Sequence, residues 1–222
     1  MNEFAGRIAL VTGGTTGIGL GIAQALESAG AKVIAAGFPG LDVTSQESVD
    51  ALILGMTRLD ILVNCAGIIR RDEEFEMEVF EQVVDVNLIG TMRMCMACKP
   101  LLSASGGAIV NIASMLTFFG GPRVPAYSAS KGGIAQLTRS LAVAWAPGGI
   151  RVNAVAPGWI RTPMTQGLQE DAGRSASILA RTPMARWGTA EDVAGPVLFL
   201  CSAAAAFVTG VVLPVDGGYS VS

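Results

Sequence analysis

The stretch Arg7-Ile-Ala-Leu-Val-Thr-Gly-Gly-Thr-Thr-Gly-Ile-Gly19 decides the fold, because an apolar run passes through a glycine-rich turn into a helical pattern. The apolar run predicts a buried strand, and apolar residues at three- and four-residue spacing up to Ala29 predict the helix. Glycines permit positive φ angles and let the backbone approach a pyrophosphate, whose charge a helix N-terminus stabilises. The spacing is Gly-x-x-x-Gly-x-Gly, so an ordinary tight turn between strand and helix is the alternative to a dinucleotide-binding turn.

The rest of the chain repeats this alternation of strand and helix. Apolar runs predict strands at residues 32–36, 60–67, 108–112, 150–155 and 211–214. Periodic segments predict helices at residues 46–56, 76–86, 88–102, 126–146 and 190–202. The strands are continuously apolar, which is typical of a parallel sheet covered on both faces. Without a repeat or linker, the pattern predicts one α/β domain over residues 1–222, a doubly wound Rossmann-like sheet.

Residues 37–44 break the alternation. Gly37-Phe-Pro-Gly40 leads directly into Leu41-Asp-Val-Thr44, which is expected to form the third strand. Neighbouring parallel strands normally need a dozen or more connecting residues, so there is no room for a crossover helix here. We therefore expect a shortened crossover after the second strand.

The composition limits the possible functions of the chain. Its 222 residues are 51% apolar and carry a net charge of −3, with no basic run of the kind that binds nucleic acid. No apolar run approaches the length of a membrane span, and residues 1–7 lack the pattern of a secretion signal. We expect a soluble cytoplasmic protein that binds neither nucleic acid nor a membrane.

The absence of histidine excludes several kinds of site. Ser-His-Asp and Cys-His catalysis and most zinc sites require that residue, and the chain has none. Cys95 and Cys98 form a C-x-x-C pattern, but it lies in an apolar stretch without a second pair, which favours buried reduced thiols. No metal site is expected.

Tyr127 and Lys131 are the first candidates for catalysis. Their i,i+4 spacing on the predicted helix 126–146 places the phenol and the ammonium on one face. A cation favours the phenolate, so we expect a pKa below the usual value of about 10 and acid/base competence nearer neutrality. A solvated surface pair is the alternative for this motif alone. Ser114, which ends Asn111-Ile-Ala-Ser, lies thirteen residues before Tyr127.

Several motifs in order resemble the short-chain dehydrogenase/reductase family over essentially the whole chain. They are Thr12-Gly13-x-x-x-Gly17-x-Gly19, Asn64-x-Ala66-Gly67, Asn87, Ser114, Tyr127-x-x-x-Lys131 and Pro157-Gly158. The resemblance implies an oxidoreductase that interconverts a secondary alcohol and a ketone, with a nicotinamide cofactor carrying the hydride. It also implies a homotetramer.

The resemblance implies a catalytic tetrad of Asn87, Ser114, Tyr127 and Lys131. Tyr127 would exchange the proton of the substrate oxygen, and Ser114 would hydrogen-bond that oxygen, with a turn cap as its alternative role. Lys131 would bind the nicotinamide ribose, and Asn87 would hold a water that relays protons unless it is a plain buried asparagine. The residues implied to line the cofactor are Gly13, Gly17, Ile18, Gly19, Asp42, Val43, Asn64, Ala66, Gly67, Tyr127, Lys131, Pro157, Gly158, Ile160 and Thr162.

The cofactor type should be decided at the end of the second strand. An acidic residue there marks NAD, and a basic residue marks NADP. Gly37-Phe38-Pro39 offers neither. Because no cation is available for a 2′-phosphate, the sequence favours NAD over NADP.

A narrower set of motifs, including Gly67-Ile-Ile-Arg-Arg71, resembles the 2-dehydro-3-deoxy-D-gluconate 5-dehydrogenase group of this family. A keto-deoxy sugar acid is the substrate that this implies. A forked guanidinium matches a carboxylate, and the candidate arginines are Arg70, Arg71, Arg123, Arg174 and Arg186. Each is alternatively an ordinary surface or interface charge. Gluconate or polyol dehydrogenases, 3-oxoacyl carrier-protein reductases and a non-catalytic nucleotide-sensing protein remain open.

Overall fold

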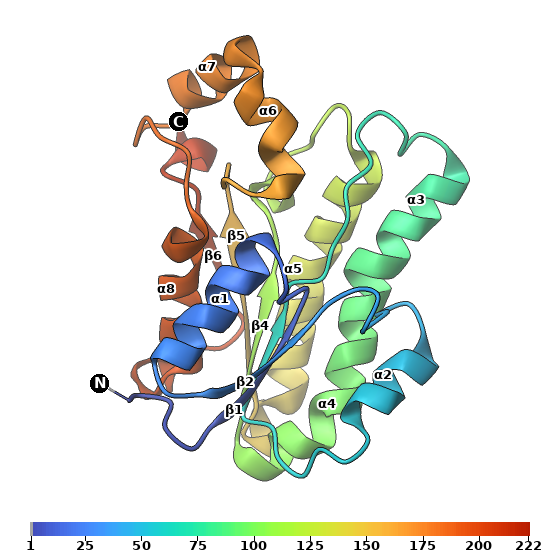
Figure 1. Cartoon of the computed structure of the whole chain (residues 1–222), viewed down its shortest axis with the longest axis vertical. Helices are drawn as coiled ribbons and strands as arrows, with labels where there is room; N and C mark the ends of the chain where they lie inside the picture. The colour runs from blue at the N-terminus through green and yellow to red at the C-terminus, as the bar shows by residue number, and fades with distance from the viewer. Residues whose placement is uncertain (1) are drawn as a thin grey trace.

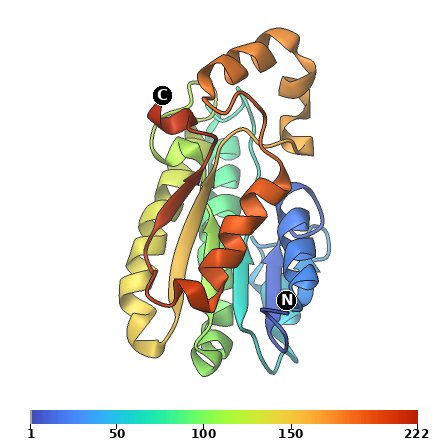
Figure 2. The same cartoon turned by 90° about the vertical axis from the view of Figure 1, so that its left-hand side faces the viewer.

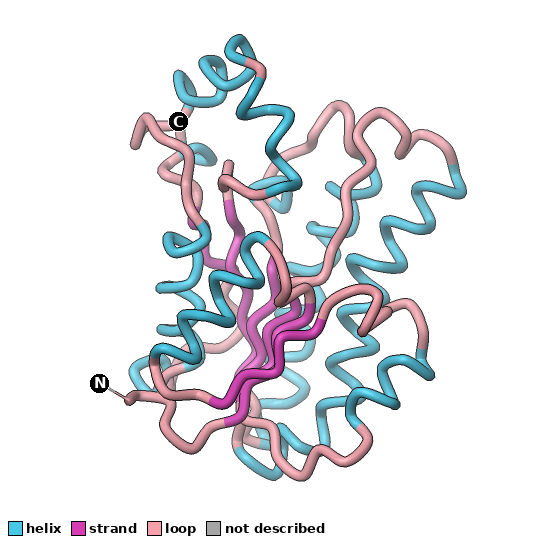
Figure 3. Tube along the Cα trace, viewed as in Figure 1, coloured by secondary structure: helices cyan, strands magenta, loops and turns pink. Residues whose placement is uncertain are grey.

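A computed structural model describes residues 2–222 and contains one six-stranded parallel sheet in the order β2-β1-β3-β4-β5-β6. Figure 3 shows the strands side by side at the centre of the molecule. Their bounds are β1 (Ile8–Thr12), β2 (Lys32–Ala36), β3 (Ile61–Asn64), β4 (Ala108–Ile112), β5 (Arg151–Pro157) and β6 (Val212–Val215). The predicted doubly wound parallel sheet is confirmed.

Helices cover both faces of the sheet, and Figure 2 shows the two layers. One face carries α1 (Gly17–Ser28) and α8 (Ala190–Cys201), which pack against each other. The other carries α2 (Gln46–Ile53), α3 (Met77–Val84), α4 (Gly90–Ser105) and α5 (Pro125–Trp145). Two short helices, α6 (Gln166–Glu170) and α7 (Ala172–Arg181), lie beyond the carboxyl ends of the strands (Figure 1).

Alternate residues of each strand supply the two cores. Ala9 and Val11 of β1 belong to the cluster with α1 and α8, whereas Leu10 packs in the cluster with α4 and α5. Leu10 and Leu62 are fully buried, and a buried side chain of this size contributes about 1.5–3 kcal/mol relative to exposure. Burial on both faces explains why the strands are apolar at most positions and do not alternate with polar residues.

The segment after β2 differs from the expected third strand. Leu41–Thr44 does not pair with β2; residues 37–45 form an irregular connection that leads to α2, and the next strand, β3, pairs with β1 on the inner side. β2 therefore lies at the edge of the sheet with β1 as its neighbour. The predicted shortening after the second strand is confirmed, and the strand expected at Leu41–Thr44 is absent from the sheet as well.

A buried polar chain fixes α5 against the sheet. Asn64 Nδ2 donates to Asn111 Oδ1 at 2.9 Å, and Asn111 Nδ2 donates to Thr138 Oγ1 at 2.9 Å. All three residues are buried, so these hydrogen bonds are costly to lose and allow little sliding of α5 along β4. The helix that carries Tyr127 is thereby held in register with the strand that leads to Ser114.

The predicted helices 76–86 and 88–102 are joined in the structure. A π-helical segment, Asp85–Ile89, connects α3 to α4 without a break, and Asn87 lies within it. Such segments insert one wide turn and are frequent at functional sites. Within residues 2–222, every helix is too short or too polar to span a lipid bilayer.

Candidate active site

The carboxyl ends of β1, β3, β4 and β5 bring the predicted cofactor residues together. Gly13 and Gly17 have φ angles of 62° and 52°, in the region that favours glycine. A Cβ on Gly19 would lie 2.1 Å from the carbonyl oxygen of Gly13. Thr16, the N-cap of α1, makes no side-chain capping bond, so the first amides of this helix keep their capacity to bind an anion. This turn fits the pyrophosphate of a dinucleotide.

Two cavities flank the turn. The first, of about 170 Å³, is lined by the turn and by Cys65, Tyr127, Lys131 and Thr162. The second, of about 510 Å³, lies toward the predicted adenosine side and includes Asp42 and Val43. Ala66 and Gly67 line both cavities.

Asn64 has a different position from the other predicted cofactor residues. It lines neither cavity, because its amide is buried between β3 and β4. Its Oδ1 has no hydrogen-bond partner among residues 2–222. Thr12 performs a role that the motifs did not indicate: its Oγ1 accepts hydrogen bonds from the amides of Cys65 and Ala66, at 3.1 Å each, and fixes the wall that both cavities share.

Replacing Gly19 with alanine is expected to weaken dinucleotide binding at least tenfold, because the added carbon would push the backbone of Gly13 away from the pyrophosphate position. Gly195→Ala in α8 is the matched control, since nothing lies within 4 Å of its added carbon. We expect this control to bind normally and to be stabilised by up to about 1 kcal/mol. Dissociation constants from NADH fluorescence check both, and equal affinities would contradict the assigned pyrophosphate site.

Tyr127 lines the first cavity, and Ser114 lies beside it. The Ser114 hydroxyl hydrogen-bonds the Tyr127 phenol, and the same oxygen accepts a hydrogen bond from the amide of Leu116 at 3.2 Å. Ser114 therefore combines its two alternative roles, since it caps a short 3₁₀ turn and also contacts the phenol. The cap holds the hydroxyl in a fixed direction.

The pKa of Tyr127 differs from the sequence prediction. Burial raises it to about 12, and the hydrogen bond from Ser114 and the charge of Arg71 oppose that rise. The predicted lowering by Lys131 was wrong for this structure. Lys131 Nζ lies 5.5 Å from the centroid of the phenol ring and donates instead to the carbonyl of Ile112 at 2.7 Å.

Lys131 is itself perturbed by its surroundings. Burial lowers its pKa to about 8. Asn87 is fully buried behind Gly67, where its Oδ1 accepts a hydrogen bond from the amide of Ile68 at 2.8 Å and its Nδ2 donates to Ser130 Oγ at 3.1 Å. Asn87 thereby ties α5 to the loop after β3.

A third cavity, of about 120 Å³, opens beside Ser114 and Tyr127 and includes Pro157, Gly158, Ile160 and Thr162. Arg71 is its one charged lining residue. The pKa of Arg71 is lowered, mainly because its side chain is partly buried. Its nearest acceptor is the carbonyl of Met164 at 3.4 Å, so Arg71 has no carboxylate partner among residues 2–222.

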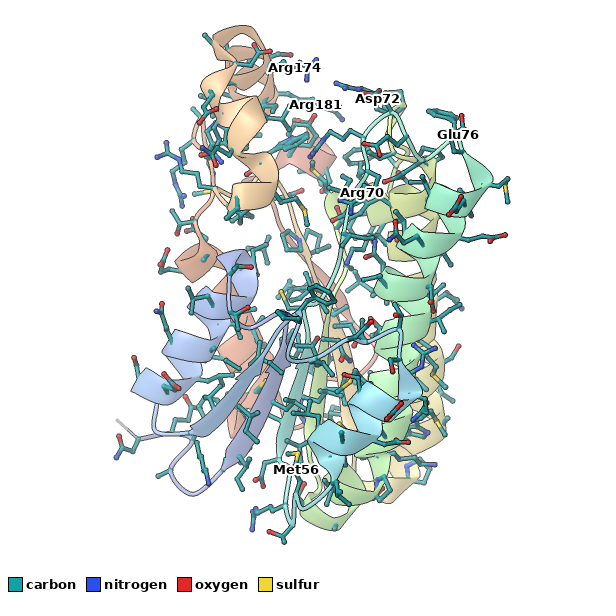
Figure 4. The ribbon with its side chains drawn as sticks, turned by 45° about the vertical axis from the view of Figure 1, so that its right-hand side comes forward. Met56, Arg70, Asp72, Glu76, Arg174 and Arg181 are labelled. Carbon is teal, nitrogen blue, oxygen red and sulfur yellow. The ribbon has the colours of Figure 1, made fainter. Side chains whose placement is uncertain are left out.

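The other four predicted arginines do not line this third cavity. Arg123 pairs with Asp72, Arg174 with Asp171, and Arg186 with Asp192. Arg70 lines the adenosine-side cavity. Figure 4 shows Arg174 at the outer end of the molecule and Arg70 on the loop below it.

Sequence reasoning missed three residues around these cavities. Trp159 lines the third cavity, and its buried Nε1 has no acceptor among residues 2–222. Phe38, at the end of β2, is 81% exposed and lines the adenosine-side cavity. Glu74 is buried beside the N-terminus of α5. The position of Phe38 after a predicted strand was a usable signal, whereas Glu74 and Trp159 are brought in by long-range folding.

The family model described as enoyl-(acyl carrier protein) reductase matches residues 38–220. The chain belongs to the short-chain dehydrogenase/reductase family. As a member, it is an oxidoreductase that acts on CH–OH groups with a nicotinamide dinucleotide as its cofactor. The predicted family and enzyme class are confirmed.

The chain is similar to several named or solved proteins, among them the following three. A 2-dehydro-3-deoxy-D-gluconate 5-dehydrogenase of Bacillus subtilis is 42% identical over 240 aligned residues, covering 96% of this chain and 94% of the relative. An Escherichia coli protein of the same name is 39% identical, covering 96% and 95%. The structure of a gluconate 5-dehydrogenase from Burkholderia cenocepacia, in complex with NADP and tartrate, matches with a TM-score of 0.92 and 34% identity, covering 100% and 98%.

The chain also differs in length from the Bacillus subtilis relative. The aligned length of 240 exceeds the 222 residues of this chain, so the Bacillus subtilis relative contains segments that this chain lacks. The shortened connection after β2 is one place where the structure has lost an element of the doubly wound pattern.

Proposed function

We propose that this dehydrogenase interconverts a ketone and a secondary alcohol on a keto-deoxy sugar acid of the 2-dehydro-3-deoxy-D-gluconate type. The observation that carries the proposal is Arg71, an unpaired cation in the cavity that also contains Ser114 and Tyr127. A guanidinium at this position can bind the substrate carboxylate while the phenol meets the reacting oxygen. The names of the Bacillus subtilis and Escherichia coli relatives support the same substrate class.

In this proposal the chain itself supplies proton transfer and orientation. A bound nicotinamide dinucleotide supplies the hydride acceptor or donor. Tyr127 holds the proton for the substrate oxygen, and its raised pKa keeps it protonated near neutral pH, as a proton donor for ketone reduction requires. Ser114 donates a hydrogen bond to the same oxygen. Lys131 binds the nicotinamide ribose.

Asn87 acts mainly through its protein partners in this proposal. It holds the loop after β3 against Ser130 of the Tyr127 helix. Its remaining acceptor capacity is available for the relay water that the family resemblance implies.

Turnover on a panel of compounds tests this function. We expect the highest kcat/KM on keto-deoxy sugar acids, and lower values on neutral ketoses and on 3-oxoacyl thioesters. A preference for neutral polyols would favour a polyol dehydrogenase, and a preference for thioesters would favour a carrier-protein reductase. Dinucleotide binding without turnover of any carbonyl compound would favour the nucleotide-sensing alternative.

We further propose that the enzyme accepts both NAD and NADP. The NAD preference expected from the sequence depended on the lack of a cation after β2, but Gly37 and Phe38 also lack the carboxylate that would repel a 2′-phosphate. Thr15 and Thr16 line this side of the cavity with hydroxyl groups, which suit either ribose. The Burkholderia cenocepacia relative, solved with NADP, supports a role for the phosphorylated cofactor.

Replacing Phe38 with arginine is expected to lower the Kd for NADPH about tenfold and to leave the Kd for NADH within about threefold. The exposed position of Phe38 at the cavity mouth allows a guanidinium to reach a 2′-phosphate. Phe38→Ala is the control, because it opens the same space without a charge. Fluorescence titration measures each Kd, and an equal gain for both cofactors would contradict the placement of the ribose.

The proposal also includes a single domain formed by residues 1–222, a cytoplasmic location and a homotetramer. The single domain and the location follow from the sequence pattern and composition, and the homotetramer follows from the family resemblance. Analytical ultracentrifugation of the purified chain checks the tetramer.

A further inference from the structure

Glu74 is a buried carboxylate that none of the proposed catalytic steps uses. Its side chain lies in the loop between β3 and α3 and the residue is 1% exposed. Oε1 accepts a hydrogen bond from the amide of Arg70 at 2.9 Å, and Oε2 accepts one from the amide of Tyr127 at 2.8 Å. No lysine or arginine among residues 2–222 forms a salt bridge with it.

The contact with Tyr127 satisfies the first turn of α5. That helix begins at Pro125, which has no N–H, and its N-cap, Val124, offers no side-chain acceptor. The early amides of a helix otherwise lack partners, and a negative charge near them is favourable. Glu74 supplies both a hydrogen-bond acceptor and a negative charge to this helix end, although it lies 53 residues before Tyr127 in the chain.

Two further contacts attach the same loop to the segment before Tyr127. The amide of Asp72 donates to the carbonyl of Arg123 at 2.9 Å, and the side chains of these two residues form an ion pair. Arg71 lies between the two attachment points, Asp72 on one side and the Glu74-bound amide of Arg70 on the other. The position of Arg71 relative to Tyr127 therefore depends on these contacts.

We propose that Glu74 is a positioning residue that sets the spacing between the carboxylate-binding Arg71 and the proton-donating Tyr127. This inference rests on the proposed function. By holding the amides of Arg70 and Tyr127 on one rigid carboxylate, Glu74 couples the two ends of the substrate site. A misplaced anchor of this kind costs rate and apparent affinity, because the reacting groups leave their productive geometry.

Glu74 also acts on the Tyr127 phenol through its charge. Burial is the main cause that raises the pKa of the phenol; Ser114 and Arg71 lower it, and Cys65 and Glu74 add to the rise. Lys131 faces the phenol ring at 5.5 Å. Removing the charge at Glu74 should therefore lower the pKa of Tyr127. In the oxidation direction the phenolate is the reactive form, so the rise of rate with pH should move to lower pH.

Glu74→Gln tests the proposal because it keeps the shape of the side chain and removes the charge and one acceptor. We expect KM for the sugar acid to rise about tenfold. We also expect the pH profile of alcohol oxidation to shift to lower pH. Glu73→Gln, at the exposed neighbouring position, is the matched control and should change neither. Identical KM values and profiles in the two variants would overturn the proposal.

A second readout separates this inference from the proposed function. The chain has two tyrosines, Tyr127 and Tyr219, so ¹⁵N-tyrosine labelling gives two amide signals, which the Tyr219→Phe variant assigns. A hydrogen bond to a buried carboxylate should place the Tyr127 amide downfield and slow its exchange, and Glu74→Gln should reverse both effects. An unchanged Tyr127 signal would overturn the role of Glu74. A lack of sugar-acid turnover by the wild type, together with a shifted signal, would overturn only the proposed function.

Arg123→Gln provides a second variant that does not disturb the buried carboxylate. Because Arg123 and Asp72 are both exposed, this change should be tolerated in folding. We expect it to raise KM for the sugar acid about threefold and to leave the pH profile in place. If Glu74→Gln does not fold, an unchanged KM in Arg123→Gln would still overturn the coupling of the loop to Tyr127.

Discussion

Replacement of Tyr127 by phenylalanine is expected to lower kcat about 10³-fold to 10⁴-fold, because the variant loses the group that exchanges the proton of the substrate oxygen. Dinucleotide affinity should stay within about twofold, since the ring remains in place beside Lys131. Steady-state kinetics with the preferred sugar acid, together with fluorescence titration of NADH, separates the two quantities.

Tyr219→Phe is the matched control for this experiment. Tyr219 is the other tyrosine of the chain, and it packs beneath the guanidinium of Arg181, with 4.4 Å between the guanidinium carbon and the ring centroid. Its hydroxyl accepts a long hydrogen bond of 3.4 Å from Arg181, so its loss should change kcat less than about threefold. A Tyr127→Phe variant with kcat within tenfold of the wild type would contradict the role of the phenol.

The pKa of Tyr127 makes the two reaction directions respond differently to pH. The free protein holds this pKa at about 12. For ketone reduction the protonated phenol is required, so this group should not limit kcat/KM between pH 6 and 9. For alcohol oxidation the phenolate is required, and kcat/KM should rise with pH over the same range.

Replacement of Arg71 by methionine is expected to lower kcat/KM for the sugar acid about 10-fold to 150-fold. A charge-assisted hydrogen bond to a carboxylate contributes about 1.5–3 kcal/mol, and methionine keeps part of the apolar stem without the charge. The loss should fall mainly on KM, because the carboxylate is bound in both the ground state and the transition state. A neutral ketone of similar size should lose much less.

Arg174→Met is the matched control for Arg71. Arg174 lies on α7, its side chain is 51% exposed, and it pairs with Asp171 three residues earlier. Exposed pairs of this kind contribute little, so kcat/KM should change less than about twofold. If both variants lose the same activity, or if the neutral ketone loses as much as the sugar acid, Arg71 does not bind the substrate carboxylate.

The fold followed from local patterns that the structure preserves. The glycine turn after residues 7–12 and the mainly apolar runs decided the parallel sheet, because burial on both faces favours apolar residues at most positions of a strand. The third strand expected at Leu41–Thr44 is absent, because this segment is buried without pairing in the sheet. Its apolar residues Leu41 and Val43 are buried, but they pack in the core beneath the sheet instead of pairing along β2. A sequence of four residues cannot distinguish these two kinds of burial.

The proximity of site residues could be predicted where two of them belong to one motif, as Tyr127 and Lys131 do. Ser114, Tyr127 and Lys131 lie together as their spacing suggested. The pKa of the phenol was not predictable, because it depends on burial, which tertiary packing sets. The sequence also could not show which of the five candidate arginines is free to bind a substrate carboxylate. Only the folded chain shows that Arg123, Arg174 and Arg186 are neutralised by nearby aspartates.

The position of β2 at the rim of the sheet has a consequence for the behaviour of this protein in concentrated solution. Within residues 2–222, no strand lies beside the outward backbone groups of Lys32–Ala36, and such a row is a template for self-association between chains. The strand has five residues, and its first, Lys32, is exposed and carries a positive charge. Brevity and like-charge repulsion at Lys32 are thus local features that oppose the joining of sheets from different copies of this chain.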